Sequence, residues 1–205
     1  MPRRFESVLL FGAPGVGKGT QGRLLGQIPG FYHLATGDIF RSLDAESELG
    51  KKSLEYSSQG LLVPDEFTIR AWQGYMKERI EAQDFRPGAD LLVLDGIPRN
   101  VNQAKIVDEH IDVLRIVHLK APNIDEMVVR MKKRAETEGR IDDADESVIR
   151  RRFEVYDEET APVLGHYDAH LVSDVIAIGT PAEVLMQVLQ AIVPVYRDHF
   201  GNPLG

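Results

Sequence analysis

The first residues that could do chemistry lie in the glycine-rich stretch GAPGVGKGT, residues 12–20. Its glycines allow backbone N–H groups to curl around phosphate oxygens, and Lys18 can reach the terminal phosphates of a nucleotide. The spacing matches the phosphate-binding loop G-x-x-x-x-G-K, except that Gly19 precedes the hydroxyl of Thr20. An apolar run precedes the stretch and a helical pattern follows it. We therefore predict a phosphate-binding loop rather than a chance glycine-rich turn.

Two further motifs, YHLATGDIFR (residues 32–41) and LLVLDGIPRNVNQ (residues 91–103), each follow or contain an apolar run. Their polar side chains suit nucleotides: Thr36, Asp38 and Arg41 in the first motif, and Asp95, Arg99 and Gln103 in the second. Ligands bind at the carboxyl ends of the strands in an open parallel sheet, so the motifs should converge with the glycine-rich loop. Asp95 could hold Mg²⁺ or its waters there, or it could cap the following turn.

Residues 130–152, RMKKRAETEGRIDDADESVIRRR, concentrate basic side chains in a chain whose formal net charge is −8. Arg150 has Glu146 and Glu154 at i−4 and i+4, which favours a surface salt bridge. Arg152 lies on the inward side of the expected helix, where an unpaired guanidinium is costly and therefore needs an anion. We interpret the segment as a partly solvated surface that aims a few arginines at phosphate.

The elements that position these residues alternate between strands and helices. Five apolar runs predict strands: 7–11, 31–34, 90–94, 114–119 and 171–178. Helical patterns between them predict a doubly wound α/β domain. Residues 36–82 suggest successive helices, 136–146 suggest a loop between two helices, and the tail from Pro194 is expected to be loosely attached.

Composition narrows the class of protein. The 205 residues suit one domain, with 43% apolar and 27% charged residues. The acidic balance argues against nonspecific nucleic-acid binding. The chain has no cysteine, so disulfides and cysteine-ligated zinc are excluded. No apolar run approaches a membrane span, and the run after the first arginines is too short for a signal peptide. We therefore expect a cytoplasmic protein with no nucleic-acid or membrane partner.

Taken together, GAPGVGKGT, ATGDIFR, GLLVPDE, LDGIPRN…Q and GRIDD…R…Y resemble the adenylate kinases, within the nucleoside monophosphate kinases. The resemblance runs from about Ser7 to Leu189, and the Lys-Gly-Thr variant of the loop is that family's own form. It implies an α/β P-loop three-layer sandwich, in which helices flank a parallel five-stranded sheet. It also implies a single kinase domain over 1–205, a small helical insertion for the nucleoside monophosphate (NMP) over 36–65, and a short lid over 135–146. Short-lid members lack the subdomain that can carry zinc, so no structural zinc is expected.

The resemblance assigns site residues one by one. ATP would contact Gly15, Val16, Gly17, Lys18, Gly19, Thr20, Arg134 and Gly179, the last through its carbonyl. AMP would contact Thr36, Arg41, Leu61, Val63, Gly96, Arg99, Gln103, Arg140 and Arg152. The catalytic residues would be Lys18, Arg99, Arg134, Arg140 and Arg152, and Asp95 would orient Mg²⁺ through water. The motif leaves Arg151 as second choice to Arg152, and Asp142 and Asp143 are expected to hold Arg140.

The implied reaction is reversible phosphoryl transfer from Mg·ATP to AMP, giving two ADP, by a protein expected to be a monomer. A UMP/CMP kinase of the same fold is one alternative, although Thr36 and Gln103 disfavour it. A P-loop ATPase switch is another, and it would need a water-positioning residue that we do not identify. A nucleotide-binding module without catalysis is a third, disfavoured by Lys18, Asp95 and the arginines.

Overall fold

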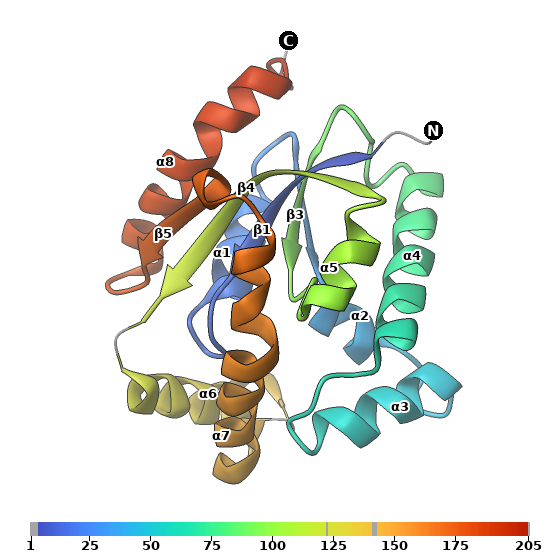
Figure 1. Cartoon of the computed structure of the whole chain (residues 1–205), viewed down its shortest axis with the longest axis vertical. Helices are drawn as coiled ribbons and strands as arrows, with labels where there is room; N and C mark the ends of the chain where they lie inside the picture. The colour runs from blue at the N-terminus through green and yellow to red at the C-terminus, as the bar shows by residue number, and fades with distance from the viewer. Residues whose placement is uncertain (1–3, 122, 141–142, 205) are drawn as a thin grey trace.

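The computed structural model describes residues 4–121, 123–140 and 143–204. Its centre is a five-stranded parallel sheet of order β2-β3-β1-β4-β5. The strands are β1 (Phe5–Phe11), β2 (Phe31–Ala35), β3 (Leu91–Asp95), β4 (Ile111–Lys120) and β5 (Val172–Ile176). Figure 1 shows the sheet with helices on both sides. The predicted parallel α/β fold is confirmed.

Eight α-helices connect and cover the strands within the described ranges. They are α1 (Lys18–Leu25), α2 (Thr36–Ser42), α3 (Glu48–Ser57), α4 (Asp65–Glu81), α5 (Val101–Val107), α6 (Ile124–Glu138), α7 (Glu146–Val155) and α8 (Pro181–His199). A π-helical turn (Tyr156–Thr160) and two 3₁₀ turns (Ala161–His166 and Ala169–Leu171) link α7 to β5. Side-chain caps fix several starts. For example, Thr180 and Glu183 form a capping box at the start of α8.

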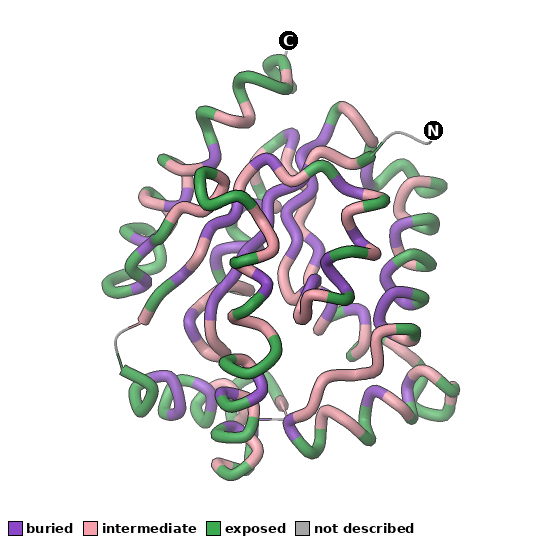
Figure 2. The backbone as a smooth tube through the Cα atoms, in the orientation of Figure 1, coloured by how far each residue is buried: buried purple, intermediate pink, exposed green. Residues whose placement is uncertain are grey.

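The core lies on both faces of the sheet because successive strand residues point to opposite sides. Val8 and Leu10 of β1 belong to the cluster formed with α1 and α8, whereas Leu9 and Phe11 belong to the cluster formed with α4 and α5. Burial on both faces explains why the strand sequences are continuously apolar rather than alternating. Figure 2 shows the central strands as the most continuously buried part of the chain.

Several predicted boundaries differ from the structure. Strand β4 begins at Ile111, three residues before its predicted start. Strand β5 stops at Ile176, and Ile178 beyond it is 53% exposed. Helix α6 continues to Glu138, so it includes the first three residues of the segment expected to be a loop. The expectation of a loose tail from Pro194 is wrong, because α8 runs through this proline to His199 and Tyr196 stacks between Phe31 and Phe200, with ring centroids 4.8 and 5.0 Å apart.

Two peripheral parts lie beyond the carboxyl ends of the strands. Helices α2 and α3 lie on one side, and α6 and α7 lie on the other (Figure 1). In the described ranges, no helix combines the length and the apolar content that a membrane crossing requires. These two parts flank the end of the sheet at which the predicted motifs meet.

Candidate active site

A cleft of about 870 Å³ opens at the carboxyl ends of the strands. It is lined by residues of the glycine-rich loop, the strand ends, the α2–α3 region and the α6–α7 region. Sixteen of the predicted site residues line it: Gly15, Gly17, Lys18, Gly19, Thr20, Thr36, Arg41, Leu61, Val63, Asp95, Gly96, Arg99, Gln103, Arg134, Arg140 and Arg152. Val16 and Gly179 are not among its lining residues, since Val16 is 2% exposed in the core and Gly179 lies on the surface before α8.

The glycine-rich loop joins β1 to α1, and Lys18 is the first residue of that helix. Its ammonium donates hydrogen bonds to the carbonyl oxygens of Gly12 and Ala13, at 2.6 and 3.1 Å. A side chain at Gly12 would lie 2.4 Å from the Leu119 carbonyl oxygen, so this turn requires glycine. The loop thus holds a lysine at a helix N-terminus, which is an arrangement suited to phosphate.

The sheet register brings the second and third motifs together. Ala35 of β2 pairs with Asp95 of β3, so the next residues, Thr36 and Gly96, are also neighbours. The Thr36 hydroxyl donates to the Gly96 carbonyl at 2.8 Å, and a side chain at Gly96 would lie 2.7 Å from that hydroxyl. The Thr36 proton is therefore already used, and only its oxygen lone pairs remain for a ligand.

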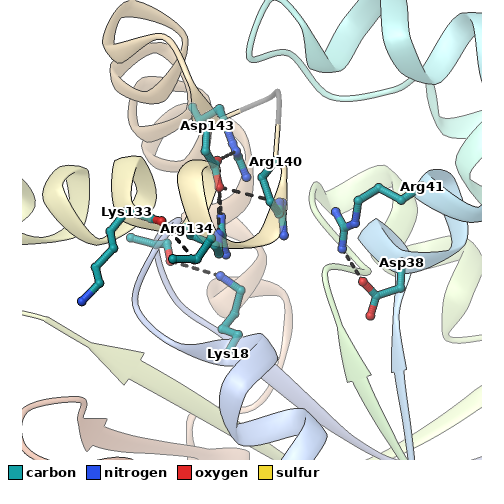
Figure 3. A network of polar contacts seen from close by, with 10 residues as sticks. Lys18, Asp38, Arg41, Lys133, Arg134, Arg140 and Asp143 are labelled. Atoms are coloured by element: carbon teal, nitrogen blue, oxygen red, sulfur yellow. Dashed lines mark hydrogen bonds and ion pairs between the residues drawn. The ribbon is translucent and has the colours of Figure 1, made fainter.

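The turn at Gly96 also positions the Arg99 side chain. Its Nε donates to the Gly96 carbonyl at 2.8 Å, and its own carbonyl accepts from the Thr160 hydroxyl at 2.8 Å. Arg41 pairs with Asp38 at the start of the helical insertion. Figure 3 shows the Arg41–Asp38 pair on one side of the view and Lys18 with the α6–α7 arginines on the other.

Asp143 gathers the arginines of the α6–α7 region. Its carboxylate is fully buried and accepts from Arg134 Nε at 2.8 Å and from Arg152 Nη1 at 2.5 Å, and Arg140 Nε lies 3.7 Å away. Arg134 and Arg140 converge on Asp143 above Lys18 in Figure 3. The expected contact between Asp143 and Arg140 is present, and Asp143 holds two more arginines that the sequence did not suggest. Asp142 lies outside the described residues.

The three consecutive arginines of α7 differ in how far their side chains are exposed to solvent. Arg152 is 20% exposed, whereas the Arg150 and Arg151 side chains are 51% and 43% exposed. Arg150 pairs with Glu146 as expected, but Glu154 pairs with Arg151 at 2.8 Å, and the second partner of Arg150 is Asp125. The i+3 geometry of Arg151 brings it to Glu154, which explains the exchange.

Burial, together with the surrounding positive charge, lowers the pKa of two cations. Burial, together with the nearby Arg99, Arg152 and Arg134, lowers the pKa of Lys18 to about 8, although Asp95 opposes the shift. Burial and repulsion by Arg152, Arg41 and Arg140 lower the pKa of Arg99 to about 10, again against Asp95. A cleft that penalises its own cations in this way favours a polyanionic ligand.

Several lining residues received no site role in the sequence analysis, where Tyr156 appears only as the last letter of a motif. Arg23, Arg130 and Lys133 add further cations to the cleft wall, and Tyr156 and Thr160 belong to the π-helical turn that follows α7. Helical spacing could have indicated Arg130, which lies one turn before Arg134. No sequence pattern indicates a π-helical turn, because that turn arises where α7 meets the next segment.

One carboxylate stands beside the glycine-rich loop. A side chain at Gly19 would lie 3.6 Å from the Asp95 carboxylate, which shows how close the two approach. Among the described residues no group of three or more His, Asp or Glu side chains could hold a metal ion. A single carboxylate fits Mg²⁺, because this ion keeps several waters and takes its other ligands from substrate phosphates.

A parallel sheet with a glycine-rich loop before its first helix, opposite a second set of arginines, defines a P-loop phosphotransferase. The family model described as adenylate kinase matches residues 10–172. Similar proteins, each named adenylate kinase, come from Kocuria rhizophila (37% identity, 90% of this chain and 97% of the relative), Thermus thermophilus (37%, 91% and 97%) and Mycolicibacterium vanbaalenii (38%, 90% and 98%). The chain belongs to the adenylate kinase family.

Family membership confirms the predicted fold, the enzyme class and the principal function, that of an adenylate kinase. It decides against the ATPase switch and the noncatalytic module as principal functions. The roles of single residues, the extents of the insertion and lid, and the metal remain predictions.

Proposed function

We propose that the chain catalyses reversible phosphoryl transfer from Mg·ATP to AMP, giving two ADP, with the residue roles that the sequence predicts. One observation carries these roles. A single cleft is lined by the Lys18 loop, by Arg41 and Arg99, and by Arg134 and Arg152, which share the Asp143 carboxylate. Two phosphate-bearing ligands would thus meet end to end.

In this mechanism the nucleotide on the loop would present its terminal phosphate to Lys18. The acceptor phosphate would be held by Arg41 and Arg99, whose forked guanidinium groups suit bidentate contact. An oxygen of the acceptor phosphate attacks the γ-phosphorus in line, and the β–γ bridging oxygen leaves with ADP. No side chain becomes covalently attached, so positioning and charge neutralisation supply the rate enhancement.

Arg134, Arg140 and Arg152 would neutralise the charge that the transferring group shares between the two nucleotides. Asp95 would hold Mg²⁺ through water, and the ion would neutralise β- and γ-phosphate charge. We also propose that the insertion (36–65) and the short lid (135–146) close over the cleft and exclude water as a competing acceptor. Gly179 would meet the donor adenine through its carbonyl, and Val16 would contact ATP through its backbone.

We propose AMP as the acceptor because Thr36 and Gln103 line the cleft, as do Leu61 and Val63. The Gln103 amide is 1% exposed and can offer one donor and one acceptor to adenine. We further propose a cytoplasmic monomer that needs no structural zinc.

A stoichiometry measurement tests the proposal. Purified protein with Mg·ATP and AMP should form two ADP for each ATP consumed. ATP alone should yield almost no ADP, because closure excludes water. Steady ADP release from ATP without an acceptor would contradict the proposal and favour an ATPase. Size-exclusion chromatography with light scattering on the same sample tests the monomer.

A further inference from the structure

Asp65 is a carboxylate to which the proposed mechanism gives no role. It is the first residue of α4, where the helical insertion returns to the sheet, and it faces the start of α5. It accepts three hydrogen bonds from amide side chains: Asn100 Nδ2 at 2.8 Å, Gln103 Nε2 at 2.8 Å and Asn102 Nδ2 at 2.7 Å. The carboxylate therefore bridges the insertion to the helix that carries Gln103.

The Gln103 amide is held in one orientation because one of its neighbours is a hydrogen-bond donor and the other is an acceptor. Its Oε1 accepts from the backbone N–H of Arg99 at 2.8 Å, and its Nε2 donates to Asp65 Oδ1. A reversed amide would turn its NH₂ toward the Arg99 N–H and its oxygen toward the carboxylate, so both hydrogen bonds would be lost. Asn100 holds the helix itself, because its Oδ1 caps the Gln103 N–H at 2.7 Å.

This orientation determines which base edge the amide can read. Gln103 keeps one N–H and one oxygen lone pair beyond the two bonds described. Adenine offers a ring-nitrogen acceptor and an amino donor on its Watson–Crick edge, whereas a 6-oxopurine offers a ring N–H donor and a carbonyl acceptor. The reversed amide would suit the second pattern, so locking the amide separates the two kinds of base.

We infer that Asp65 is a positioning residue for acceptor specificity, which fixes the Gln103 amide so that the site prefers a 6-aminopurine monophosphate to a 6-oxopurine monophosphate. The inference rests on the proposed function, in which Gln103 contacts the acceptor base. Burial opposes ionisation of Asp65, but the three amide donors outweigh it and lower the pKa of the carboxyl. The carboxylate thus stays an acceptor at neutral pH and cannot donate to a reversed amide.

The test compares kcat/KM for AMP with kcat/KM for IMP, which differs at the 6-position. Asp65→Asn should lower the AMP:IMP ratio at least about tenfold, because one fixed hydrogen-bonding pattern is lost. Asp65→Ser keeps a small polar residue at the helix start and serves as a second variant with the same expectation. Glu66→Gln removes the neighbouring, exposed negative charge from the same helix turn and should leave the ratio unchanged.

A double-mutant cycle with Gln103→Ala shows whether Asp65 acts through the amide. Gln103→Ala should itself lower the ratio, and adding Asp65→Asn should then change it no further. If kcat/KM falls equally for AMP and IMP in both Asp65 variants, the inference about Asp65 is overturned. The same holds if Asp65→Asn still changes the AMP:IMP ratio in the Gln103→Ala background. Neither result would contradict the proposed function. An unchanged ratio in Gln103→Ala would overturn the proposed base contact and the inference with it. Wild-type protein that uses neither acceptor would overturn the proposed function.

Discussion

Replacing Asp143 by asparagine removes the anion shared by the arginines of the α6–α7 region. The carboxylate is fully buried, and its partners Arg134 and Arg152 are only 29% and 20% exposed. Hydrogen bonds to charged groups contribute roughly 1.5–3 kcal/mol each. Asparagine keeps one acceptor oxygen but turns an NH₂ group toward a guanidinium. The nucleotide-free protein should therefore lose about 2–4 kcal/mol of unfolding free energy, which lowers Tm by roughly 4–16 °C for a chain of this size.

The same substitution should lower kcat. Arginines that no longer share an anion adopt several orientations, and loss of about 1.5–3 kcal/mol of transition-state positioning corresponds to roughly 10–100-fold in rate. Bound nucleotides supply negative charge to the same arginines, so the Tm difference should shrink when ATP and AMP analogues are present.

Thermal melts with and without nucleotide, together with steady-state kinetics, test both effects. Asp157→Asn makes the same chemical change on an exposed residue of the π-helical turn and serves as the control. A variant at Asp143 that melts like the control and turns over at the wild-type rate would refute the reasoning, because the buried carboxylate would then hold nothing that matters to the fold or the reaction.

Three further outcomes follow from the site. Arg140→Ala and Arg152→Ala should each lower kcat at least about a hundredfold, whereas Arg150→Ala should change it little, since exposed ion pairs are worth under about 1 kcal/mol; similar kcat values for all three would contradict the assignment. ATP binding should weaken as pH rises above about 8, because Lys18 of the nucleotide-free protein loses its charge there and must take up a proton when ATP binds. A titration with a nonhydrolysable ATP analogue measures this, and a pH-independent Kd would count against it. EDTA should abolish turnover and leave Tm of the nucleotide-free protein unchanged, and a large drop in that Tm would reveal a structural metal.

The sequence predicted the sheet and the cleft because both depend on local patterns. Continuous apolar runs identify buried parallel strands, and the position of Lys18, Thr36 and Asp95 after such runs brings them to one edge of the sheet. Family resemblance extended this to the arginines. Helical periodicity then separated Arg152 from Arg150, which the exposures reproduce.

The remaining features depend on contacts between distant segments. Asp65 stands in a recognisable motif, yet nothing near it in the sequence indicates three amide donors from the N-cap and first turn of α5, which lie 35 to 38 residues away. The tail after Pro194 contains polar residues and glycine, which suggested a loose segment. It is attached to the domain because the Tyr196 ring stacks on Phe31, which is distant in the sequence. The exchange of Glu154 from Arg150 to Arg151 reflects side-chain directions that residue spacing alone does not determine.

The choice of acceptor tests the central claim most directly. ADP formation from Mg·ATP should be measured in one coupled assay with AMP, UMP, CMP or no acceptor. We expect kcat/KM for AMP to exceed the values for UMP and CMP well over tenfold, since a pyrimidine leaves polar groups around Gln103 unpaired. Comparable efficiency with UMP or CMP would contradict AMP as the preferred acceptor and identify a pyrimidine monophosphate kinase of the same fold.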